Sequence, residues 1–203
     1  MNLERALSDI AAMRVQVART TQFRGYGPVT LAMTGCIALA AGMLQHFVLP
    51  SPTAHIGGYL SIWISAAIAS VSAVALECIT RSRRVHSDLA DQMILLALQH
   101  FLPAGVAGVL LTVVIAQFAP TSVWMLPGLW QIVLSLGVFA TAHTVPRPLV
   151  LVGVWYLTCG LFCLVLAQGA RGLSPLAMAV PFASGQFLAA ALLQYVEGRY
   201  DEI

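Results

Sequence analysis

The sequence predicts an all-α protein: a polytopic transmembrane helical bundle of six spans, preceded by an amphipathic helix on the cytoplasmic side. Two observations lead to this prediction. Hydrophobic residues make up 59% of the 203 residues and charged residues only 9%, against roughly 25% charged residues in soluble domains. In addition, the stretch from Gln92 to Thr144 contains no Asp, Glu, Lys or Arg. A stretch of this length is too long for the core of a soluble domain.

Six apolar segments are each long enough to cross a bilayer, for which a helix needs about 20 residues. Short connections separate them, and most of these carry proline or glycine, for example residues 49–53 and 144–148. Helices are expected because every backbone N–H in lipid must be bonded within its own segment. The predicted spans are residues 28–49, 57–79, 92–118, 123–143, 149–167 and 173–196.

The segment before the first span is predicted to form an amphipathic interfacial helix, which lies on the membrane surface or docks on a partner subunit. Its apolar residues recur at helical intervals, at Leu3, Leu7, Ile10, Met13 and Val17. The expected organisation is therefore this helix in residues 1–25, a six-span membrane domain in residues 26–198 and a short cytoplasmic tail in residues 199–203.

The arginines predict the orientation, because cytoplasmic loops carry an excess of positive charge. In a six-span arrangement, every arginine except Arg171 falls on one side of the membrane, so both termini are expected in the cytoplasm. Residues 23–28 and 126–131 resemble stretches of small bacterial inner-membrane proteins, and this resemblance implies a bacterial inner (cytoplasmic) membrane. The arginines between the second and third spans are expected to contact lipid headgroups or a partner; they are Arg81, Arg83 and Arg84.

Polar side chains inside the spans are the candidate functional residues, because such groups are costly in lipid. Gln131 and Gln186 lie well inside the fourth and sixth spans, and Ser61 and Ser65 belong to a stripe of small residues on the second. These residues are expected either to make interhelical contacts or to line a polar pathway. No carboxylate lies near the middle of a predicted span, which disfavours ion-coupled transport.

His100 is the one histidine that is expected well inside a span. The sequence predicts no metal site and no cofactor. If the chain did bind haem or chlorin, His100 would be the expected ligand of the tetrapyrrole metal. Otherwise its expected role is to bond backbone near Pro103, whose ring frees the carbonyl of Gln99.

The sequence contains no recognisable nucleophile, base and acid set, no phosphate-binding loop and no paired carboxylates, so we expect no enzyme. The leading hypothesis is a non-catalytic accessory or scaffold subunit of a larger membrane complex, whose partners are the bilayer, other membrane subunits or a second copy. The alternative is a small homo-oligomeric channel or uniporter for a neutral or weakly polar solute. A second alternative is a tetrapyrrole-binding membrane subunit.

Overall fold

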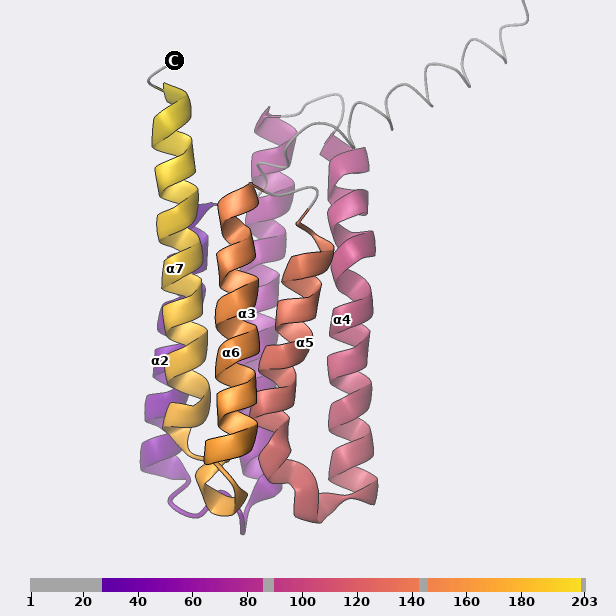
Figure 1. Cartoon of the computed structure of the whole chain (residues 1–203), viewed down its shortest axis with the longest axis vertical. Coiled ribbons are helices and arrows are strands. Elements are labelled where there is room, and N and C mark those ends of the chain that lie inside the picture. Colours follow the sequence, from indigo (N-terminus) through magenta and orange to yellow (C-terminus); the bar gives the residue numbers. More distant parts are fainter. Residues whose placement is uncertain (1–26, 86–89, 143–145, 202–203) are drawn as a thin grey trace, which may run out of the picture.

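The computed structural model describes residues 27–85, 90–142 and 146–201 (Figure 1). Within these ranges the protein contains helices and no strand, and six of the helices are long and apolar enough to cross a membrane. The predicted all-α bundle of six spans is therefore confirmed. The amphipathic helix that is predicted for residues 1–25 lies outside the described residues.

The six long helices are α2 (Pro28–Val48), α3 (Ile56–Val85), α4 (Ala90–Phe118), α5 (Leu126–Ala140), α6 (Val150–Leu166) and α7 (Pro175–Asp201). Short 3-10 segments precede α5, α6 and α7; they are η1 (Pro120–Met125), η2 (Arg147–Leu149) and η3 (Gly169–Arg171). The segment η1 continues directly into α5, and together they form the fourth span.

Proline marks the starts of two helices, and two helices run further than the sequence predicts. Pro28 and Pro175 are the first residues of α2 and α7, a position at which the missing N–H has no helical partner to lose. Helix α3 continues past the predicted end at residue 79 to Val85, and α7 continues to Asp201. The polar residues at these ends include arginine and glutamate, which favour helix, so the helices do not stop where the apolar segments end.

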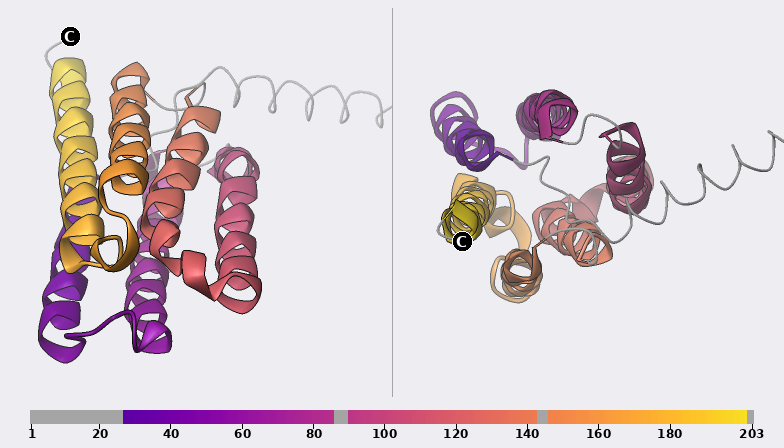
Figure 2. Two further views of the ribbon diagram at one scale, coloured as in Figure 1. Left: turned by 60° about the horizontal axis from the view of Figure 1, so that its bottom comes forward. Right: turned by 90° about the horizontal axis from the view of Figure 1, so that it is seen from above.

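The helices form a ring in chain order, and α2 and α7 close it (Figure 2). The pairs α2–α7 and α5–α6 pack most extensively. Glycine permits this close packing: a Cβ atom added at Gly42 of α2 would lie 2.6 Å from the Cβ atom of Ala179 in α7. Small residues at helix contacts are the usual way in which membrane helices approach one another.

Burial is unequal around the ring. Within the most apolar 18-residue stretch of α3 and of α4, only 6% of the residues are buried inside this chain, against 33–39% in the other four spans. Helix α3 is buried mainly near its start, through Tyr59 and Trp63. These two helices therefore leave most of their surface uncovered by the rest of the described chain.

Candidate functional site

Side chains from three helices, α2, α5 and α6, donate hydrogen bonds to backbone carbonyl groups of one short segment, residues 173–182, which leads into α7 and forms its first turns. Gln45 of α2 and Gln131 of α5 donate hydrogen bonds to the carbonyl groups of Leu173 and Ala177, at 2.7 and 2.9 Å. From α6, Trp155 Nε1 donates to Pro181 O at 3.2 Å and Tyr156 Oη to Phe182 O at 3.3 Å. Trp63 of α3 joins this set through Gln45.

Pro181 explains why Gln131 is needed. Proline has no N–H, so the carbonyl group four residues earlier, that of Ala177, lacks its usual helical donor. The Gln131 amide supplies the missing hydrogen bond. The Gln131 side chain is completely buried. The contact therefore keeps the proline-containing part of α7 fully bonded in an apolar environment.

Gln45 has both ends of its amide bonded to protein. Its Nε2 atom donates to Leu173 O, and its Oε1 atom accepts a hydrogen bond from Trp63 Nε1, each at 2.7 Å. The side chain is 0% exposed. This residue ties α2 and α3 to the segment that enters α7.

Sequence reasoning did not select Gln45 as a candidate, although a signal was present. The buried face of α2 consists of small residues at helical spacing, and Gln45 continues that face; it comprises Thr34, Gly35, Ala38, Ala41 and Gly42. An amide on the small-residue face of a span is placed to bond across a close helix contact.

The Tyr156 side chain packs against Gly185 of α7, where any larger residue would clash with it. A Cβ atom added at Gly185 of α7 would lie 2.6 Å from the Tyr156 hydroxyl oxygen. The side chain of Gln186 also lies beside this hydroxyl group. Gln186 is half-buried, on the α6-facing side of α7.

The four residues proposed as a polar pathway do not face one another. Gln131 is buried and Gln186 is half-buried, whereas Ser61 and Ser65 are exposed on the outer surface of α3. The Ser61 hydroxyl donates to Gly58 O and the Ser65 hydroxyl to Ser61 O, within their own helix. Their hydroxyl groups are thus directed to backbone of α3 and away from the interior amides.

His100 lies on the exposed surface of α4, a turn before Pro103. Nothing lies within 4 Å of the Cβ position at Gly105, which is on another side of α4. Among the residues that the structure describes, no three His, Cys, Asp or Glu side chains group as metal ligands would. Arg81, Arg83 and Arg84 belong to the last turns of α3.

We expect Gln131→Leu to destabilise the protein by about 1–3 kcal/mol, because it leaves the Ala177 carbonyl buried without a donor. Pro181→Ala restores an N–H for that carbonyl, so the same Gln131→Leu change should cost less in the Pro181→Ala background. Thermal unfolding of the four proteins in one mild detergent measures this double-mutant cycle. The matched control is Gln117→Leu at an exposed position of α4. An equal cost of Gln131→Leu in both backgrounds would contradict the assignment.

No protein-family model, no curated protein and no solved structure matches this chain. The class of protein therefore rests on the fold itself. Six apolar helices, each of membrane-spanning length, define an integral, multi-pass membrane protein.

Proposed function

We propose that this protein is a non-catalytic accessory or scaffold subunit of a larger membrane complex, and that it binds a span of another membrane subunit through α3. The observation that carries the proposal is the unequal burial of the ring, in which α3 and α4 are largely uncovered by their own chain. Four polar side chains support it as well, because they bond backbone of residues 173–182 and so join α2, α5 and α6 to α7.

The outer surface of α3 has the composition of a helix contact. Ser61, Ser65 and Ala69 follow one another at four-residue intervals, and all three are exposed. In lipid there is no hydrophobic force between helices, so small residues that allow close packing distinguish a contact from a lipid-facing surface.

The expected orientation places the chain ends on the cytoplasmic side of a bacterial inner membrane. Arg147 belongs to η2, at the end of the bundle where α2 begins and α7 ends, and Arg171 belongs to η3 at the opposite end (Figure 1). The positive-inside rule, applied to the arginines of the whole sequence, supports this orientation.

A photoactivatable residue at Ala69 should cross-link to a different membrane protein in native membranes. Ser65→Leu should weaken this association roughly tenfold, because a bulky side chain prevents close helix approach and such contacts are worth about 1–2 kcal/mol. Blue native electrophoresis of the same membranes measures the fraction of the chain in the complex.

The matched control is Val71→Leu, which enlarges an exposed apolar side chain on another side of α3. It should leave the complex intact. Ser65 is exposed and its hydroxyl group bonds backbone of its own helix, so Ser65→Leu should not change the unfolding temperature of the isolated protein. A monodisperse monomer without any adduct would contradict the proposal, and so would an adduct that contains only two copies of this chain.

A further inference from the structure

Two side-chain oxygen atoms in the described part of the protein are buried without a hydrogen-bond partner: Tyr59 Oη and Gln131 Oε1. Both side chains are 0% exposed. Inside a membrane there is no bulk water to bond such groups, and leaving a polar atom unbonded is unfavourable. Buried polar atoms in folded proteins are nearly always bonded to protein or to ordered water.

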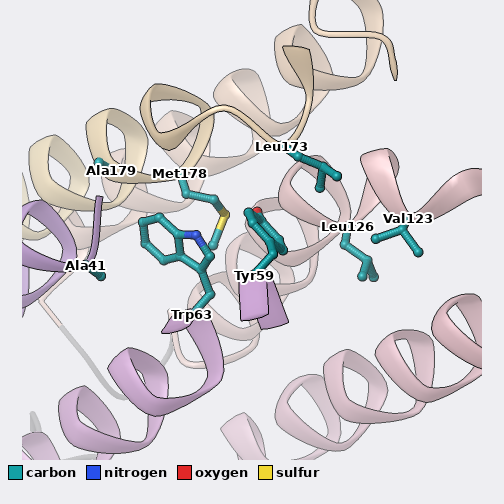
Figure 3. Close-up of a cluster of buried hydrophobic side chains, with 8 residues drawn as sticks. All are labelled: Ala41, Tyr59, Trp63, Val123, Leu126, Leu173, Met178 and Ala179. Carbon is teal, nitrogen blue, oxygen red and sulfur yellow. The ribbon is translucent and has the colours of Figure 1, made fainter. Parts of the chain in front are cut away.

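Both side chains contact the segment that leads into α7 and forms its first turns. Tyr59 packs in one cluster with Leu126 of α5 and with Leu173 and Met178 at the start of α7 (Figure 3). Gln131 lies on α5 five residues after Leu126 and bonds the carbonyl group of Ala177, the residue before Met178. Tyr59 from α3 and Gln131 from α5 therefore both lie against residues 173–178.

The orientation of Gln131 follows from its bonded end. Its Nε2 atom must face the Ala177 carbonyl, because Pro181 provides that carbonyl with no helical donor. Reversing the amide would place an oxygen against a carbonyl oxygen. The Oε1 atom is therefore held toward the interior as an acceptor that needs a donor.

The chemistry of these groups specifies the molecule that would bind there. A glutamine Oε1 atom only accepts hydrogen bonds, whereas a tyrosine hydroxyl group donates or accepts. The buried residues of the surrounding cluster carry no charge. A suitable molecule is neutral, donates at least one hydrogen bond and is small enough to fit among packed side chains.

We propose that Tyr59 and Gln131 form a buried binding site for small neutral hydrogen-bonding molecules, and that water occupies it in the protein at rest. Water is the smallest molecule that donates to Gln131 and also bonds the Tyr59 hydroxyl group. Buried waters typically make about three hydrogen bonds to polar groups that otherwise lack partners. This site is independent of the proposed association through α3, because Ser61, Ser65 and Ala69 lie on the outer surface.

The chain contains a matched control for this proposal. Gln45 and Gln131 are the same residue type, both 0% exposed, but both ends of the Gln45 amide are bonded to protein. Magnetisation transfer from water to glutamine side-chain amides, measured by solid-state NMR in lipid bilayers, should give a several-fold stronger signal for Gln131. Gln131→Leu and Gln45→Leu identify the two signals.

A second measurement uses the sign of a stability change. Tyr59→Phe removes only the hydroxyl group; if water bonds that group, the unfolding temperature should fall by about 2–4 °C. Tyr156→Phe, which loses the bond to Phe182 O, is the reference for a lost hydrogen bond. A Gln131 signal no stronger than that of Gln45 overturns the proposal. So does an unchanged or higher unfolding temperature for Tyr59→Phe, which is the result expected for an oxygen without any partner.

Discussion

Gln45→Leu should destabilise the protein by about 2–5 kcal/mol, because it leaves two buried groups without partners at once. The Leu173 carbonyl loses its donor and Trp63 Nε1 loses its acceptor, and each unpaired buried group costs about 1–3 kcal/mol. Leucine has nearly the volume of glutamine, so the loss reports the hydrogen bonds and includes little change in packing. Thermal unfolding in a mild detergent measures the effect.

Two further variants make this result specific. Gln194→Leu replaces the same residue type at an exposed position of α7 and should change the stability by no more than about 0.5 kcal/mol. In a Trp63→Phe background the indole donor is absent, so Gln45→Leu should cost less than in the unchanged protein. If Gln45→Leu and Gln194→Leu have similar effects, Gln45 does not hold α2 and α3 to α7.

Gly160→Val should destabilise the protein by about 1–3 kcal/mol or more, because it forces α5 and α6 apart. A Cβ atom added at Gly160 would lie 2.7 Å from the backbone oxygen of Gly128 and 2.8 Å from the Ile132 side chain. A Cβ atom added at Gly128 would in turn lie 2.8 Å from the backbone oxygen of Gly160. A backbone oxygen cannot rotate away as a flexible side chain can.

The control for this prediction is Gly105→Val, the same replacement on α4 at a position with nothing within 4 Å of the added Cβ atom. It should change the unfolding temperature by no more than about 2 °C, whereas Gly160→Val should lower it by roughly 3–12 °C. Equal shifts for the two variants would mean that backbone contact between α5 and α6 does not limit the packing.

The sequence predicts the interior position of Gln131 and Gln186, but it does not predict their partners. A proline such as Pro181 indicates a carbonyl group without a helical donor four residues earlier. It does not indicate that the donor is Gln131, which lies 46 residues before Ala177 in the chain. Only the ring arrangement of α5 and α7 brings the two together. The same holds for Gln45 and Leu173, which are 128 residues apart.

Ser61 and Ser65 show a second limit of prediction from sequence, which concerns the face of a helix that is buried. Their spacing predicts correctly that they share one side of a helix, but it does not predict that this side faces outward. In a soluble helix, polar residues mark the exposed face. In a membrane helix, the lipid and the protein interior are similarly apolar, so the hydrophobic pattern hardly distinguishes the two faces.

The number and the approximate limits of the six spans follow from the sequence alone. The bilayer requires long apolar segments and hydrogen-bonded backbone, and both requirements can be recognised in one segment at a time. The tertiary structure decides which face of each helix is buried, since that depends on close contacts such as Gly128 with Gly160. It also decides that Tyr59 and Gln131 are both buried against residues 173–178. These contacts join residues that are distant in the chain, and no local pattern of hydrophobicity specifies them.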